Sequence, residues 1–263
     1  VQTEVKKDRL HTTEQNNNNV NTDKPETKMS MSARHYSMPQ QMAHDGKSAE
    51  TRNLRPNEVS TGTTIMAIPF EGGVIMGADS RVSTGSYVAN RVSDKVAQLH
   101  DRIWCCRSGS AADTQALTDY VKHYLSSLAI ETGRCPTVKV AAHLMRRLCY
   151  ENKDRLLAGV IVGGWDRVDG GSVYNIPLGG TCIKMPFAIG GSGSTYIYGL
   201  VDSEFKEGMT KDEALTLVKK AISHAMARDG SSGGIIRTVT VTEESNDREF
   251  VPGNQLPYGP AGW

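Results

Sequence analysis

The chain has 263 residues, 30 basic and 29 acidic side chains, and a formal net charge of +1. This balance gives no electrostatic case for binding nucleic acid or an anionic membrane, and no apolar run approaches the ~20 residues of a membrane span. The five cysteines show no Cys-x-x-Cys spacing. We therefore expect reduced thiols in an intracellular protein, with no disulfide framework.

Residues 1–62 have the composition of a disordered segment. They are rich in Asn, Gln, Thr and charged residues, and Tyr36 is their single aromatic. Such a segment buries too little apolar surface to offset its ordering entropy. It has neither the apolar region of a secretory signal nor the acid-poor bias of a transit peptide. We expect a disordered, cleavable propeptide over residues 1–62 and a single domain over residues 63–263.

Strand and helix patterns follow one another along the rest of the chain. Apolar, β-leaning runs separated by Gly-rich turns predict strands, and apolar residues at helical spacing predict amphipathic helices. The predicted strands span residues 63–70, 73–79, 95–99, 103–107, 158–165, 172–177, 182–189 and 235–242, with a shorter one at 248–251. The predicted helices have their apolar faces within residues 117–128, 140–148 and 211–227. Two antiparallel sheets stacked face to face, with helices packed outside, would bury every apolar face, which makes the fold class α+β.

The first candidate site is Gly62-Thr63. A threonine hydroxyl is a weak nucleophile and needs an adjacent base. Cleavage after Gly62 would give Thr63 a free α-amino group with an ordinary pKa of about 7.7–8. One residue would then supply both nucleophile and base. The alternative is a Gly-Thr turn that leads into an ordinary strand.

Asp79 and Lys95 form a second candidate pair, since each lies at the end of a predicted strand. If the strands at 63–70, 73–79 and 95–99 are neighbours, both side chains meet Thr63 at one end of the sheet. The lysine would then lower the pKa of the hydroxyl and the amine. The alternative is a surface ion pair, worth about 0–1 kcal/mol.

Three glycine- and serine-rich segments allow more than one interpretation. Ser108-Gly109-Ser110 suits an oxyanion hole at a helix N-terminus and equally a plain N-cap. Gly191-Ser192-Gly193 lacks the third glycine of a dinucleotide-binding loop. Asp229 and Ser232 follow the third helix, where they either end it or form hydrogen bonds across a site. The histidines form no metal-binding or triad pattern, so we expect no metal and no cofactor.

Together these segments resemble the motif series of the catalytic beta subunits of the proteasome. The series consists of Thr63-Thr64-Ile65, Gly77-Ala78-Asp79-Ser80-Arg81, Asp94-Lys95, Ser108-Gly109-Ser110-Ala111-Ala112-Asp113, Gly191-Ser192-Gly193 and Arg228-Asp229-Gly230-Ser231-Ser232-Gly233. The resemblance runs in order from residue 63 to about residue 245. It implies an N-terminal nucleophile hydrolase with a four-layer αββα sandwich.

The resemblance also implies roles for individual residues. Thr63 would be the nucleophile, with Lys95 and Asp79 as its electrostatic support and the Gly109 N–H as the oxyanion donor. Ser192, Asp229 and Ser232 would form the network around the freed amine. We find no departure from the family's pattern at these positions.

Four further residues would bind substrate, and Gly62 would be the processing position. Arg81 would brace the site, the Ser83 backbone would align the substrate strand, and Ala111 would line the substrate-binding surface. Arg107 matches the floor of the specificity pocket, where an arginine marks the caspase-like subunit that cuts after acidic residues.

The resemblance places the protein among stacked seven-membered rings of alpha and beta subunits that degrade unfolded polypeptides in the cytoplasm and nucleus. Two alternatives remain open from the sequence. One is a non-catalytic structural subunit of the same ring, which keeps its tail. The other is a stand-alone N-terminal nucleophile amidase that acts on small molecules.

Overall fold

The computed structural model describes residues 62–84 and 86–259, which are built around two antiparallel sheets. The expected propeptide lies outside the described residues except for Gly62. The first sheet has the strand order β10-β1-β2-β11-β12, and each neighbouring pair is antiparallel. Its strands are β1 (Ile65–Phe70), β2 (Gly73–Ala78), β10 (Ala188–Gly190), β11 (Ile236–Thr242) and β12 (Asn246–Val251).

The second sheet has the strand order β5-β6-β7-β8-β9 and is also antiparallel throughout. Its strands are β5 (Val96–His100), β6 (Ile103–Gly109), β7 (Ala158–Asp166), β8 (Gly170–Ile176) and β9 (Ile183–Lys184). Two short strands, β3 (Val82–Thr84) and β4 (Tyr87–Asn90), pair only with each other.

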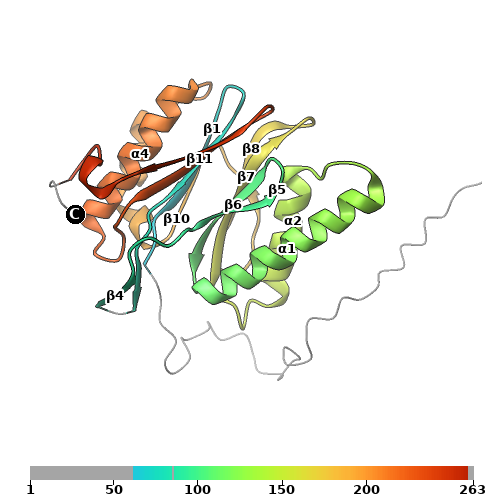
Figure 1. Cartoon of the computed structure of the whole chain (residues 1–263), viewed down its shortest axis with the longest axis horizontal. Helices are drawn as coiled ribbons and strands as arrows, with labels where there is room; N and C mark the ends of the chain where they lie inside the picture. The colour runs from blue at the N-terminus through green and yellow to red at the C-terminus, as the bar shows by residue number, and fades with distance from the viewer. Residues whose placement is uncertain (1–61, 85, 260–263) are drawn as a thin grey trace, which may run out of the picture. The chain divides into compact units, whose positions relative to one another are not determined.

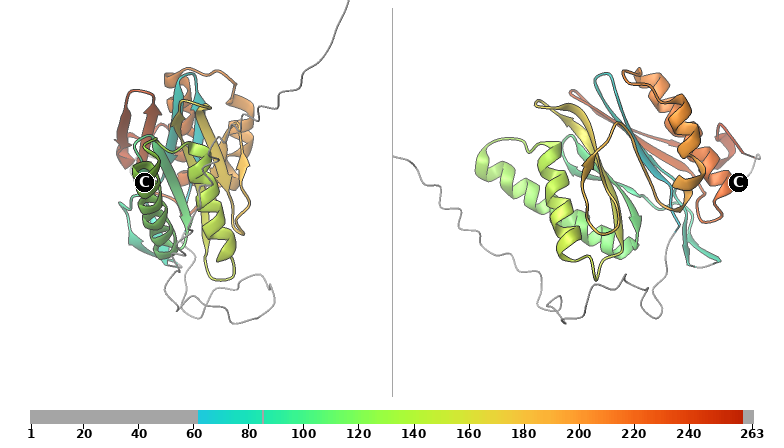
Figure 2. Two further views of the ribbon diagram at one scale, coloured as in Figure 1. Left: turned by 90° about the vertical axis from the view of Figure 1, so that its right-hand side faces the viewer. Right: turned by 180° about the vertical axis from the view of Figure 1, so that it is seen from behind.

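The helices lie on the outer faces of the two sheets. They are α1 (Ala111–Thr132), α2 (Val138–Glu151), α3 (Tyr198–Glu204) and α4 (Lys211–Arg228), with 3₁₀ turns η2 (Ser192–Tyr196) and η3 (Gly253–Gln255). Figure 1 shows α1 and α2 against the second sheet and α4 against the first. Figure 2 shows the same succession of layers from two other directions. The four-layer αββα sandwich implied by the sequence is confirmed.

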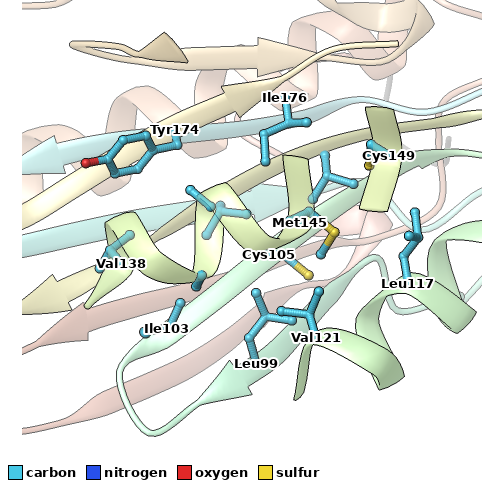
Figure 3. Close-up of a cluster of buried hydrophobic side chains, with 14 of the residues drawn as sticks. Leu99, Ile103, Cys105, Leu117, Val121, Val138, Met145, Cys149, Tyr174 and Ile176 are labelled. Atoms are coloured by element: carbon cyan, nitrogen blue, oxygen red, sulfur yellow. The ribbon is translucent and has the colours of Figure 1, made fainter. Parts of the chain in front are cut away.

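Three apolar clusters fill the spaces between these layers. One lies between the second sheet and helices α1 and α2, and includes Leu99, Val121 and Met145 (Figure 3). A second lies between the first sheet and helices α3 and α4. The third lies between the two sheets. Cys105 belongs to the helix-side cluster and Cys106 to the inter-sheet cluster, as expected for strand neighbours that face opposite ways.

Polar caps define where the long helices begin. Ser110 and Thr137 accept hydrogen bonds from backbone N–H groups in the first turns of α1 and α2. Thr210 and Glu213 form a reciprocal capping box at the start of α4. Gly133, with a φ of 64°, ends α1 in the left-handed conformation that glycine adopts at little cost. The N-cap interpretation of Ser108-Gly109-Ser110 is therefore confirmed for Ser110.

The structure corrects one expected strand and adds a hairpin and a helix that the sequence patterns do not predict. The run at 182–189, predicted as one strand, forms β9 in one sheet and β10 in the other. Pro186 lies between them, and proline cannot donate a hydrogen bond to a continuous ladder. The hairpin β3-β4 and the helix α3 were not predicted, because segments this short carry little periodic signal. No helix in the described ranges is long and apolar enough to cross a bilayer.

Candidate active site

Thr63 and Asp79 meet because β1 and β2 are antiparallel neighbours. Thr63 lies two residues before β1, and Asp79 directly follows β2. The Asp79 Oδ1 accepts a hydrogen bond from the backbone N–H of Thr64 at 2.8 Å. The backbone N–H of Asp79 donates to the Thr64 carbonyl at 3.1 Å. These two bonds fix the start of β1 against the carboxylate.

Lys95 reaches this site from the opposite sheet. The condition that its strand neighbours β1 and β2 is not met, since β5 is an edge strand of the second sheet. The Lys95 Nζ nevertheless lies 2.7 Å from the Asp79 Oδ1 across the space between the sheets. The two side chains are 6% and 0% exposed, so the surface ion-pair alternative is also wrong.

Burial sets the electrostatics of this pair. Desolvation lowers the pKa of the Lys95 amine below its ordinary value, and Asp79 acts in the opposite direction by favouring the charged form. The Asp79 Oδ2 accepts backbone N–H bonds from Arg81 and Gly233, each at 3.0 Å. The buried carboxylate is therefore hydrogen-bonded through both oxygens, as a buried charge requires.

The Gly62–Thr63 peptide bond lies directly against this pair. The Thr63 Oγ1 donates a hydrogen bond to the Gly62 carbonyl oxygen at 2.7 Å, and the Lys95 Nζ donates to the same oxygen at 3.3 Å. A Cβ built on Gly62 would overlap the Cβ and the backbone of Ser231. The position accordingly has no room for a side chain.

A second network surrounds the Thr63 nitrogen. Its N–H donates to the Ser192 Oγ at 3.1 Å, and the Ser192 Oγ donates to the Asp229 Oδ2 at 2.7 Å. The Ser232 Oγ donates to the same carboxylate oxygen at 2.6 Å and also lies 2.7 Å from the Thr64 Oγ1. Asp229 is the C-cap of α4. The structure thus brings together the three residues that the sequence assigned to this network.

Gly191 allows the η2 turn to approach Thr63. It adopts a φ of 84°, and a Cβ at this position would overlap the Thr63 carbonyl. The Gly193 N–H donates to that carbonyl at 3.1 Å. The glycines of Gly191-Ser192-Gly193 therefore serve a close backbone contact, which explains their presence without a nucleotide.

Comparison with known proteins identifies the family. A family model described as proteasome subunit matches residues 59–241. A proteasome subunit beta type-6 of Dictyostelium discoideum is 58% identical over 201 residues, which cover 76% of this chain and 94% of the relative. A proteasome subunit beta type-1 of Saccharomyces cerevisiae is 52% identical over 204 residues, which cover 78% of this chain and 94% of the relative.

The chain belongs to the proteasome subunit family. It is a beta subunit of the core particle, where members of this family assemble with other alpha and beta subunits. A proteasome subunit beta type-9 of Rattus norvegicus is 50% identical over 205 residues, covering 78% of this chain and 93% of the relative.

Of the remaining expected residues of this proteasome subunit, Arg81 contacts the loop that carries Asp229 and Ser232, and the others lie on β3, β6 and α1. Arg81 donates from Nη1 to the Gly230 carbonyl at 2.9 Å, so it braces the loop after α4. Ser83 is buried in β3. Gly109 ends β6 with a φ of 100°, and Ala111 is the exposed first residue of α1.

Arg107 is a strand neighbour of this site, since its backbone N–H donates to the Lys95 carbonyl at 2.9 Å. Its guanidinium donates to the Gln115 Oε1 at 2.8 Å and to the Asp94 carbonyl at 2.9 Å. The Arg107 Nε is buried without a hydrogen-bond partner. Within the described residues, Arg107 forms no ion pair with a carboxylate.

Sequence reasoning missed two residues that shape the site. Thr64 links the two networks through its backbone and its hydroxyl. Strand alternation carries a signal for it, because a residue next to Thr63 must point its side chain to the opposite face. Ser231 restricts position 62, and no local pattern indicates this contact, because the two residues are far apart in the chain.

Proposed function

We propose that this beta subunit is a threonine endopeptidase of the proteasome core particle that cleaves peptide bonds after acidic residues. One observation carries the proposal: the Thr63 hydroxyl and the Lys95 amine both contact the carbonyl that precedes Thr63. A nucleophile, a charged group and a reactive carbonyl are therefore adjacent before any cleavage takes place.

The first reaction we propose is self-cleavage between Gly62 and Thr63, which divides the chain into a 1–62 propeptide and a 63–263 catalytic domain. The Thr63 oxygen bonds to the Gly62 carbonyl carbon, the carbon–nitrogen bond breaks, and the hydroxyl proton passes to the departing nitrogen. Lys95, which donates to the Gly62 carbonyl oxygen, stabilises negative charge on it. Water then hydrolyses the resulting ester and restores the hydroxyl.

In the mature subunit the freed α-amine of Thr63 acts as the general base. An amine with an ordinary pKa of about 7.7–8 is well matched to this task near neutral pH. The Ser192 Oγ accepts a hydrogen bond from the Thr63 nitrogen and donates one to Asp229, so these two residues would orient the amine. Lys95 would favour the ionised hydroxyl, as a positive charge does beside a developing negative one.

Substrate would lie along the strand that contains Ser83, through backbone hydrogen bonds of the β-augmentation type. The N–H of Gly109, the last residue of β6 and two residues before α1 begins, would donate to the developing oxyanion. Ala111 would line the same surface. Arg81 and Ser232 would support the site through the contacts described above.

Arg107 supports a preference for acidic side chains on the amino side of the cut, the P1 position. A guanidinium holds a carboxylate with two parallel hydrogen bonds. The Arg107 charge has no carboxylate partner in the described part of the chain. Nη1 and Nη2 each make one hydrogen bond and keep a second N–H. The nearby Gln115 carries no charge and offers nothing to attract a basic P1 side chain.

Membership of the proteasome family removes the stand-alone amidase alternative. Against the non-catalytic alternative, the residues of the two networks are all present and in mutual contact. The eukaryotic relatives support a place in the cytoplasm and nucleus, and unfolded polypeptides are the substrates we propose. Hydrolysis of a Glu-P1 peptide by core particles with and without Thr63→Ala tests the function directly.

Gly62→Ala is expected to slow propeptide removal severalfold. The added methyl group would overlap Ser231, and the required shift would move the Gly62 carbonyl away from the Thr63 hydroxyl. Gly199→Ala is the matched control, since nothing lies within 4 Å of a Cβ at that position. Pulse-chase labelling during assembly measures both rates. Equal processing rates for Gly62→Ala and Gly199→Ala would contradict the steric argument.

A further inference from the structure

The Arg107 guanidinium is held from two sides, and the two supports differ in kind. The Asp94 carbonyl, which accepts from Nη2, is part of the backbone. The side chain of the same residue, Asp94, pairs with Arg248 at 2.7 Å. The other support is the Gln115 side chain, which is exposed on α1 and free to rotate unless something fixes it. The orientation of the guanidinium plane therefore depends on Gln115.

Asp119 fixes the orientation of the Gln115 amide. The Gln115 Nε2 donates to the Asp119 Oδ1 at 3.0 Å, one helical turn further along α1. A carboxylate accepts hydrogen bonds and cannot donate them when ionised, so it selects the NH₂ end of the amide. The oxygen end must then face Arg107. A flipped amide would place two donors, the NH₂ group and the guanidinium, against each other.

The orientation of the Arg107 guanidinium decides whether its remaining N–H donors can bind a substrate carboxylate. A guanidinium has five N–H donors, of which Gln115 and the Asp94 carbonyl each take one. The Nε–H has no partner but is buried, so the donors left for a carboxylate are the second N–H groups of Nη1 and Nη2. Two parallel bonds to a carboxylate require a fixed guanidinium plane. A rotated guanidinium would lose this geometry while keeping its charge.

We propose that Asp119 is a positioning residue for the acidic-P1 pocket, acting on Arg107 through Gln115. The proposal rests on the P1 preference proposed above. Asp119 does not pair with Arg107 itself: within the described residues, its hydrogen bond is to Gln115. Its contribution is to hold the Gln115 amide so that Arg107 presents its unused donors to the substrate carboxylate.

The sign of the effect separates positioning from simple electrostatics. Asp119 is a negative charge close to a site for negative substrates. If charge alone mattered, Asp119→Ala would strengthen binding of acidic peptides, because a repulsive carboxylate is gone. Positioning predicts the opposite, since Gln115 is released and Arg107 loses its orientation. Asp119→Asn removes the charge but keeps an oxygen that accepts from Gln115.

The experiment measures kcat and KM for a Glu-P1 and a Leu-P1 fluorogenic peptide on assembled core particles. Rates from Thr63→Ala particles are subtracted, so that other subunits do not contribute. Asp119→Ala is expected to raise KM for the Glu-P1 peptide about three- to tenfold, the range for one net hydrogen bond. Asp119→Asn is expected to keep KM at or below its original value. Glu151→Ala is the matched control, because it removes an exposed carboxylate from an i,i+4 pair on α2.

A KM that falls or stays constant in Asp119→Ala overturns the positioning role. Equal increases in the Ala and Asn variants also overturn it, because the Asn variant keeps the acceptor. Arg107→Met in the same assay distinguishes this failure from failure of the P1 proposal. If Arg107→Met lowers Glu-P1 turnover and Asp119→Ala does not, the specificity assignment stands and the positioning role falls. If neither changes it, both fall.

Discussion

In core particles that carry Thr63→Ala, the rate at which this subunit hydrolyses Glu-P1 peptides is expected to fall more than about a thousandfold. Removal of the nucleophile has an effect of at least this size in other hydrolases. These particles are also expected to retain residues 1–62, because the same oxygen attacks the Gly62 carbonyl. Lys95→Ala should show both defects, since it removes the amine that contacts this carbonyl. Peptide hydrolysis and a denaturing gel of purified particles measure the two effects.

Both variants are expected to assemble. In Lys95→Ala, Asp79 keeps backbone hydrogen bonds from Thr64, Arg81 and Gly233, although breaking a buried pair costs about 3–5 kcal/mol of stability. Thr63→Ser is the conservative control, because it preserves the hydroxyl and the future amine and should keep both reactions. Normal Glu-P1 turnover by assembled Thr63→Ala particles would refute the nucleophile assignment.

Arg107→Met is expected to shift specificity away from acidic P1 residues. A charge pair at about 4 Å is worth roughly 1 kcal/mol in water and 4 kcal/mol at an effective dielectric constant near 20. At about 1.4 kcal/mol per tenfold, kcat/KM for Glu-P1 peptides should fall between several-fold and several-hundred-fold. Leu-P1 peptides should be spared or cleaved faster. Arg107→Lys should be intermediate, since it keeps the charge but loses the planar fork.

The measurement is a P1 series, from Glu through Gln to Leu, with Thr63→Ala rates subtracted. The uncharged Gln separates the contribution of charge from that of side-chain size. An unchanged Glu-to-Leu ratio in Arg107→Met particles would show that this residue does not set specificity. The same particles should process their propeptide normally, because Arg107 has no contact with Gly62 among its hydrogen bonds in the described part of the chain.

Much of the catalytic network could be predicted because its members lie at the ends of regular elements. Thr63 precedes one strand and Asp79 follows the next, and a hairpin must bring such positions together. Lys95 is predicted at the site on the condition that its strand neighbours β1 and β2, whereas the structure brings it there from the other sheet. Local patterns specify strands but do not specify which sheet each strand joins, because that choice depends on long-range packing.

Other features could not be predicted because their cause is tertiary. The break between β9 and β10 lies at Pro186, but nothing nearby shows that the chain changes sheets there. The requirement for glycine at position 62 comes from Ser231. The support of Arg107 by Gln115 depends on the approach of α1 to the end of β6. In each case elements must be packed against each other before the constraint exists, even where they are close in sequence, as Arg107 and Gln115 are.

We propose that Thr63 becomes the amino-terminal residue and the nucleophile of the mature subunit. Intact-mass analysis of this subunit from purified, active core particles tests it most directly. We expect a chain that begins at Thr63. After reaction with an electrophile that requires both the hydroxyl and the free amine, the mass of Thr63 should increase by the mass of the bound reagent. If the chain in active particles still carries residues 1–62, or begins at another residue, Thr63 is not the amino-terminal nucleophile.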